Sequence, residues 1–436
     1  MLSALKNAAT SRSRVDPARA QASKSAWLRG PHVVPELSAA ILPFCGHDPR
    51  VATPGAACAT VRLCPDRSAV VVAIGCAGVR QCCTENVCEP LDEWHLGANG
   101  MSMTAALCAV LVSKGLLPSG WDLTVRDAFR LDALEWLEST DIAYHDVTLR
   151  QLLSMVGGLP TATAKDAARQ FAWWQEQTVN ARAAKKQQQQ QQQEEGTHMQ
   201  RRAYLASILS RPPAHPVGSF SYSDESYVLV GHMIETVLHE AFEELMQSHL
   251  WSPLGMSSAG FGMAGVVMAD LGRSDVVWGH GDSSGWLPNQ FDNPPALAPA
   301  GCMHSSIADW AAFIATMLSY ELAARLLGMA KADWDTLRQP GSGSGYALGW
   351  FTTSADWAEG TVLTHAGGNR HNHSSAWLAP DGDVAPLAML ICTNTGFDAP
   401  HRKIAEALIA MERTRRGCNK LNAPVLNIED SYASRV

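Results

Sequence analysis

Apolar residues occupy almost every position between Met101 and Val112, with no continuous polar face. A helix that is apolar all round is normally buried inside a larger protein. Gly115 follows Lys114 directly, and glycine suits the residue after a helix because it adopts a left-handed backbone at little cost. The pattern predicts a buried central helix over about 101–112.

Short β-type runs lie on both sides of this helix. Residues 57–63 and 68–74 are joined by Pro65-Asp66-Arg67, which predicts a hairpin. Four more runs lie at 346–352, 361–365, 373–379 and 388–394. They predict an antiparallel meander, and 401–413 then predicts a closing amphipathic helix. The sequence between the two sets of strands has a mainly helical pattern.

Composition limits the class of protein. The chain has 436 residues, of which 46% are hydrophobic and 17% charged, so it can bury a large core as a globular protein. The formal net charge of −8 without a long basic cluster argues against nucleic acid as the main partner. There is no run of 18 apolar residues, so we expect no membrane span.

Two segments stand apart from this pattern. Residues 1–30 are basic and poor in acids and lack an apolar stretch, which excludes an ordinary secretory signal. We expect a disordered segment there, either a plain tail or an organelle transit peptide, and the compartment stays open between cytoplasm and organelle. Seven glutamines, Gln187–Gln193, lie within a charged low-complexity insert at 185–195.

The approach to the central helix carries the main motif. The sequence His95-Leu-Gly-Ala98-Asn-Gly-Met101, followed by Met103-Thr104-Ala105, resembles the β-lactamase-related serine hydrolases, which include class C β-lactamases, DD-peptidases and esterases. That resemblance implies a Ser-x-x-Lys pair after the glycine. Position by position, the nucleophilic serine falls on Ala98 and the lysine on Met101, so both catalytic side chains are substituted.

Two further motifs follow in the family's order. Tyr222-Ser223-Asp224 resembles the second box, Tyr-Ser-Asn, with the tyrosine kept and the asparagine replaced by Asp224. Asp224 either lies in the site or caps the helix that begins there; both roles are compatible. His365-Ala366-Gly367 resembles the third box. The resemblance also implies an oxyanion hole built from the backbone N–H groups of Ala98 and Gly368.

The resemblance implies an α/β fold of the α+β type, with an antiparallel sheet flanked by helices and an inserted, mainly helical domain. We expect the sheet domain to comprise residues 31–115 and 299–436. Residues 116–298 would form the helical domain, and the pocket would open where the two meet.

The substitutions decide the expected function. A methyl group at Ala98 and a thioether at Met101 supply neither an attacking oxygen nor a proton acceptor. We therefore predict a catalytically degenerate protein that binds a small carbonyl or carboxylate ligand near Tyr222, Asp224 and His365, with Gly367 and Gly368, or that acts through a protein partner. The site calls for no cofactor and no metal, and the oligomeric state stays open.

Two alternatives remain. One is an active hydrolase of esters, amides or β-lactams with a displaced nucleophile, Ser102 or Tyr222. The other is a metal or redox role for Cys82, Cys83 and Cys88, which lie in a polar loop.

Overall fold

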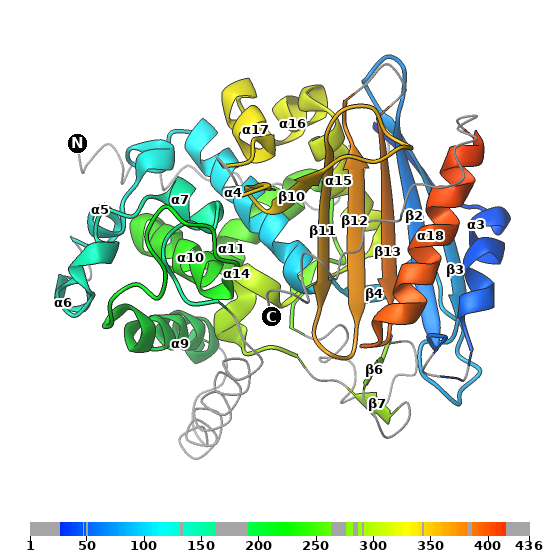
Figure 1. Cartoon of the computed structure of the whole chain (residues 1–436), viewed down its shortest axis with the longest axis horizontal. Helices are drawn as coiled ribbons and strands as arrows, with labels where there is room; N and C mark the ends of the chain where they lie inside the picture. Colours follow the sequence, from blue (N-terminus) through cyan, green and yellow to red (C-terminus); the bar gives the residue numbers. More distant parts are fainter. Residues whose placement is uncertain are drawn as a thin grey trace.

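The computed structural model describes residues 27–46, 48, 51–130, 134–161, 191–262, 276–281, 287–289, 292–341, 344–381 and 386–415. Residues 1–26 of the basic segment and 185–190 of the insert lie outside these ranges. Figure 1 shows a sheet with helices on its faces and a mainly helical region beyond one edge of it.

The strands of the main sheet are β1 (Leu28–Val33), β2 (Gly55–Leu63), β3 (Val70–Gly78), β9 (Tyr346–Ala347), β10 (Trp350–Thr353), β11 (Val362–Gly368), β12 (His373–Ala379) and β13 (Leu387–Thr393). Their order is β1-β3-β2-β13-β12-β11-β10-β9. The β2–β3 hairpin and the C-terminal meander are both confirmed. Because β13 pairs with β2, strands from the two ends of the chain share one sheet.

The expected antiparallel sheet flanked by helices is confirmed, and one strand pair at its edge is parallel. β1 runs parallel to β3, starting with Leu28 beside Val70. β1 also begins before residue 31, where the sheet domain was expected to start. The backbone pairing with β3 draws this end of the basic segment into the fold. The division into two domains otherwise stays a prediction.

Both faces of the sheet are covered. The helices α3 (Pro35–Ile41) and α18 (Asp398–Arg415) pack on one face, and α15 (Ile307–Leu318) packs on the other (Figure 1). In β13, Met389 and Ile391 face the cluster under α3 and α18, whereas Leu390 and Cys392 belong to the larger core. A strand buried on both faces is apolar at successive positions, which explains the unbroken apolar run in this sequence.

The central helix is confirmed as α4 (Gly100–Ser113), and it is buried from Gly100 to Leu111. It contacts α14 (Ala298–Gly301), α17 (Lys331–Arg338) and α10 (Asp224–Leu238). Lys114 forms its C-cap, and Gly115 follows with φ +64°. A helix enclosed by neighbours on all sides needs apolar residues on all sides, as its sequence shows.

The strand expected over 346–352 is two strands, β9 and β10. Between them Gly349 adopts φ +81°, and a Cβ atom at this position would lie 2.7 Å from the Cα of Ser102. The chain must therefore turn here without a side chain, because the backbone of α4 occupies that space.

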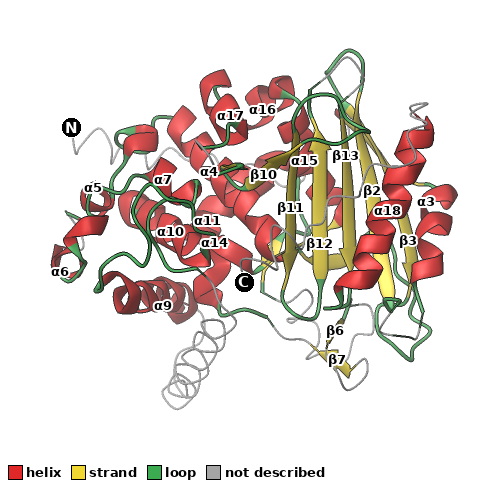
Figure 2. Cartoon of the chain, in the orientation of Figure 1, coloured by secondary structure: helices red, strands yellow, loops and turns green. Residues whose placement is uncertain are grey.

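The remaining helices form the region beyond the edge of the sheet near β10 (Figure 2). They are α5 (Val125–Phe129), α6 (Leu134–Glu138), α7 (Leu149–Leu153), α9 (Gln191–Leu209), α11 (Phe242–Met246), α12 (Ser252–Leu254) and α16 (Tyr320–Leu327). Short strands β4 (Glu93–His95), β5 (Gly260–Phe261) and β8 (Met303–Ser306) form a second sheet, and β6 (Gly279–Gly281) pairs with β7 (Leu287–Asn289).

None of the helices in the described ranges has, alone, the length and apolar composition to cross a membrane. The pair α15 and α16 meets that test jointly, with a bend of 113° between the two helices.

Candidate functional site

Ala98 is partly exposed just ahead of the central helix. It lies in a single 3₁₀ turn, Gly97–Asn99, between β4 and α4. From Trp94 to Leu111, Ala98 is the one residue that is not buried. A ligand approaching this end of α4 therefore reaches the methyl group and backbone of Ala98 before any other part of the helix.

The glycines of β11 bring that strand against the same turn. A Cβ atom at Gly367 would clash with the carbonyl oxygen of Leu96 and would lie 2.6 Å from the amide nitrogen of Ala98. A Cβ atom at Gly97 would likewise clash with the amide nitrogen of Gly368. The turn and the strand are thus in backbone contact, and the two N–H groups predicted to form an oxyanion hole lie on these touching segments.

Met101 and Tyr222 meet although they are 121 residues apart. The hydroxyl group of Tyr222 donates a hydrogen bond to the Sδ atom of Met101 at 3.4 Å. Met101 is fully buried in α4, whereas Tyr222 is partly buried just ahead of α10. The structure therefore joins the second predicted motif to the first.

His365 lies beside this pair. Its ring centroid is 6.3 Å from that of Tyr222 and 5.7 Å from that of Phe351, whose ring stacks on Tyr222 at 10°. His365 and Gly367 are two residues apart on β11, so both project from the same face of the strand. The third predicted motif consequently faces the turn at Ala98.

The environment of His365 fixes its protonation. Burial lowers the pKa of His365 to about 4, so the imidazole is neutral near pH 7. Its Nδ1 lies 2.8 Å from the carbonyl oxygen of Ala366 and donates to it. Nε2 then carries a lone pair, and among the described residues this buried atom has no hydrogen-bond partner.

Asp224 is the first residue of α10, and Ser223 holds the N-cap position, so the expectation that Asp224 caps the helix was wrong. Burial raises the pKa of Asp224 to about 7, and the neighbouring Glu225 raises it further in the same direction. Glu225 accepts hydrogen bonds from Tyr204 at 2.8 Å and from Ser223 at 2.9 Å. Because the hydroxyl of Ser223 donates to Glu225, it does not cap the backbone N–H groups at the start of α10.

Ser102 lies one turn into α4 and is buried, with 1% of its surface exposed. Its hydroxyl donates a 2.7 Å hydrogen bond to the carbonyl oxygen of Asn99. A hydroxyl held inside the helix in this way is neither accessible nor beside a base, which weighs against Ser102 as a displaced nucleophile.

Among the described residues, the three loop cysteines are not spaced to share a metal ion. Cys82 and Cys88 are buried and Cys83 is exposed. Burial raises the pKa of Cys88 well above its ordinary value, which keeps it a thiol. Within the described ranges, the one group of three side chains spaced to share a metal ion lies elsewhere, on α9 and α10. The sequence motifs did not predict this group. The one indication in the sequence is the spacing of His232 and Glu235, which places them one turn apart on a helix.

Comparison with known proteins agrees with the fold. The model of the family described as Beta-lactamase matches residues 94–412, more than half of the chain. The chain is 23% identical over 304 residues to an unguisins hydrolase of Aspergillus campestris, which covers 67% of this chain and 51% of that protein. The chain therefore spans about half the length of this curated relative.

Solved structures show the same arrangement. The octameric penicillin-binding protein homologue from Pyrococcus abyssi superposes with a TM-score of 0.60 at 19% identity, covering 82% of this chain and 74% of that one. A class C beta lactamase from Rhodobacter sphaeroides gives a TM-score of 0.57 at 16% identity, covering 82% and 95%. With the family model, the sheet order and the three motifs meeting at the head of α4, the chain belongs to the beta-lactamase family.

Proposed function

We propose that this chain is a noncatalytic member of the beta-lactamase family that binds a small ligand through a carbonyl or carboxylate group. The observation that carries the proposal is the pairing at the head of α4. A methyl group, Ala98, occupies the accessible position, and a thioether, Met101, accepts the hydrogen bond of Tyr222. By resemblance these are the positions of the nucleophile and its lysine.

The chemistry of these side chains does not support acyl transfer. A carbon-terminated side chain cannot attack a carbonyl carbon, and a thioether sulfur is too weak a base to hold a proton in water. In another serine hydrolase, loss of the nucleophile costs roughly 10⁶ in kcat. The relative from A. campestris is named as a hydrolase, so the fold carries hydrolysis there, and we propose that this chain has lost the turnover.

The groups that would bind an oxygen atom of a ligand do not depend on the substituted side chains. Backbone N–H groups donate whatever the residue, and those of Ala98 and Gly368 lie on segments in contact. His365 adds an acceptor, because the lone pair on its Nε2 is buried and unpaired within the described chain. A ligand with both a carbonyl oxygen and an N–H group complements this set.

A ligand-observed NMR titration with a short N-acyl amino acid tests the proposal, since this probe carries an amide and a carboxylate. We expect weak reversible binding to the full chain that the variant Ala98→Trp abolishes by covering this partly exposed position. Leu134→Trp, at a residue 52% exposed on α6, is the matched control and retains binding.

Lack of binding to the unaltered chain, or equal binding by Ala98→Trp, would reject the ligand proposal in favour of action through a protein partner. Turnover of the probe would instead support the active hydrolase with a displaced nucleophile.

A further inference from the structure

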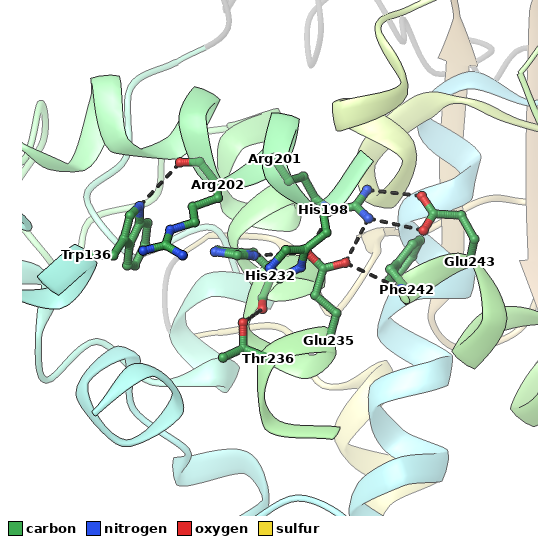
Figure 3. A network of polar contacts seen from close by, with 9 residues as sticks. All are labelled: Trp136, His198, Arg201, Arg202, His232, Glu235, Thr236, Phe242 and Glu243. Atoms are coloured by element: carbon green, nitrogen blue, oxygen red, sulfur yellow. Dashed lines mark hydrogen bonds and ion pairs between the residues drawn. The ribbon is translucent and has the colours of Figure 1, made fainter. Parts of the chain in front are cut away.

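Two histidines and a glutamate meet in the helical region, away from the head of α4. His198 lies on α9, and His232 and Glu235 lie one turn apart on α10. The Nδ1 atoms of both histidines lie 2.9 Å from the same atom, Oε1 of Glu235. The three atoms are all within 4.8 Å of one another (Figure 3).

Arg201 fixes the position of the glutamate. Its guanidinium donates to both carboxylate oxygens of Glu235, at 3.1 and 2.8 Å, and also to Glu243 on α11 at 3.1 Å. Figure 3 shows the guanidinium between the two carboxylates. Glu235 is therefore the buried carboxylate partner of Arg201 and is held in a fixed orientation.

The charges of this network do not balance. Glu235 and Glu243 carry two negative charges against the single positive charge of Arg201, and the side chains of Arg201 and Glu235 are buried. Glu235 is buried beside Arg201, whereas the side chain of Glu243 is 26% exposed, so water partly screens the remaining negative charge. A bound cation or an extra proton would neutralise that charge.

The imidazole of His232 is enclosed beside Glu235, with 1% of its side chain exposed. Its Nε2 has no hydrogen-bond partner among the described residues, so the proton of the neutral ring lies on Nδ1 and is shared with Glu235. A metal ion at Nδ1 would bind the other neutral tautomer, in which the ring proton has moved to Nε2, and would then meet a nitrogen lone pair aimed at the carboxylate.

We propose that His198, His232 and Glu235 bind a divalent transition-metal ion of the zinc type, which links α9 to α10. Two imidazole nitrogens and one carboxylate oxygen are donors that zinc prefers. Zinc binds such donors at about 2.0–2.2 Å in tetrahedral geometry, which sets neighbouring donor atoms about 3.4 Å apart. Each His–Glu separation of 2.9 Å would have to widen by about 0.5 Å, within the reach of side-chain rotation.

The site is open on one side. The side chain of His198 is 35% exposed, whereas those of His232 and Glu235 are 1% exposed. An ion can therefore enter past His198, and a water molecule can complete four-coordination from that side. Arg201, which donates to both oxygens of Glu235, is the outer partner that orients this ligand.

Zinc binding to the full chain tests the proposal. Zinc retained per chain after gel filtration, the dissociation constant and the melting temperature are measured for the unaltered chain and for His198→Ala, His232→Asn and His239→Asn. His239 is an exposed residue that ends α10 with φ +52°, and asparagine tolerates this backbone, so its variant controls for loss of one histidine. This control is needed because the chain holds 15 histidines and 11 cysteines.

We expect one zinc ion per chain and a rise in melting temperature on adding zinc, both retained by His239→Asn. His198→Ala and His232→Asn should weaken binding at least tenfold and lose the rise in melting temperature. Failure of His232→Asn to fold leaves His198→Ala, at a partly exposed residue, to decide. No binding, or binding that His198→Ala leaves unchanged, overturns the proposal and assigns the missing positive charge to a proton or the zinc to other residues.

Discussion

The hydroxyl group of Tyr222 and the Sδ atom of Met101 are 3.4 Å apart, so a phenol is paired with an uncharged sulfur at the start of the buried helix. A thioether accepts a hydrogen bond weakly and does not carry a charge that would favour a phenolate. Under the proposed function, this sulfur lies where the resemblance implies a lysine, so Tyr222 lacks the cation that would favour its ionisation. The behaviour expected of this pair can be measured directly.

Treatment of the purified chain with a β-lactam or a fluorophosphonate should leave its intact mass unchanged. Ala98 offers no oxygen, and the hydroxyl of Ser102 is buried and bonded to Asn99. Mass spectrometry of the treated protein checks this, with a known serine hydrolase in the same mixture as the positive control. A stoichiometric adduct mapped to Ser102 or Tyr222 would contradict the noncatalytic proposal.

Restoring both substituted side chains should produce slow ester hydrolysis. In the variant Ala98→Ser with Met101→Lys, the new groups are three residues apart at the start of α4 and project to the same side. The double variant should exceed Ala98→Ser alone by at least about tenfold, because general-base assistance contributes roughly 10²–10⁴. Adding Asp224→Asn should raise the rate further by freeing the new ammonium from a carboxylate.

Hydrolysis of a small ester is measured for these three variants at temperatures below their melting points, since Met101 is fully buried and a lysine there costs stability. A triple variant that melts like the unaltered chain but neither turns over nor acylates would show that the site geometry has drifted. That result would remove the main support for ligand binding.

Asp224→Asn should stabilise the chain increasingly as the pH rises. Burial, with Glu225, raises the pKa of Asp224 from 3.8 to about 7. The folded state therefore binds this proton more tightly than the unfolded state, so the contribution of Asp224 to stability falls between about pH 4 and pH 7 and is constant above. An asparagine does not ionise and escapes this loss.

Melting temperatures at pH 4.5, 6 and 8 check that prediction as the difference between variant and unaltered chain. Asp146→Asn, at a carboxylate 81% exposed, controls for removal of one negative charge. A difference that stays flat or falls with rising pH would mean that Asp224 ionises freely in the folded chain.

Gly367→Ala should destabilise the chain by about 2–4 kcal/mol, the range of an overpacked buried position. The new methyl group would meet the carbonyl oxygen of Leu96 and the amide of Ala98, both backbone atoms that cannot rotate away. Gly196→Ala is the matched control. It lies in α9 with open space around its Cα, so alanine there should stabilise by up to about 1 kcal/mol. Chemical unfolding of both variants distinguishes these outcomes, and equal stability of the two would refute the close contact.

The parts of the fold that were predictable are those in which one segment carries its own pattern. The continuous apolar run of α4 and the paired runs of β2 and β3 needed no knowledge of their neighbours. The candidate site rests on three short motifs that follow one another in order. The contact of Met101 with Tyr222 brings two of these motifs together, and the role of the site stays a prediction.

The missed features depend on contacts between distant segments. The break at Gly349 exists because α4 passes close by, and the parallel pairing of Leu28 with Val70 depends on which strand lies beside β3, which no local pattern reveals. Ser223 was overlooked as the N-cap because Asp and Ser are equally good at that position. The contact between His198 on α9 and Glu235 on α10 was also missed, because the separation of two residues along the chain does not show which helices pack together.

The backbone contact between Gly97 and Gly367 has a further consequence for inheritance. These glycines are held by steric fit between a turn and a strand, so a substitution at either one is opposed by misfolding whether or not the protein turns over a substrate. A protein that loses its nucleophile would therefore keep the backbone N–H groups of these two segments in place, because the fold depends on their contact. The close backbone contact between the Gly97 turn and β11 would then persist because folding requires it, and its N–H groups would stay available for another function.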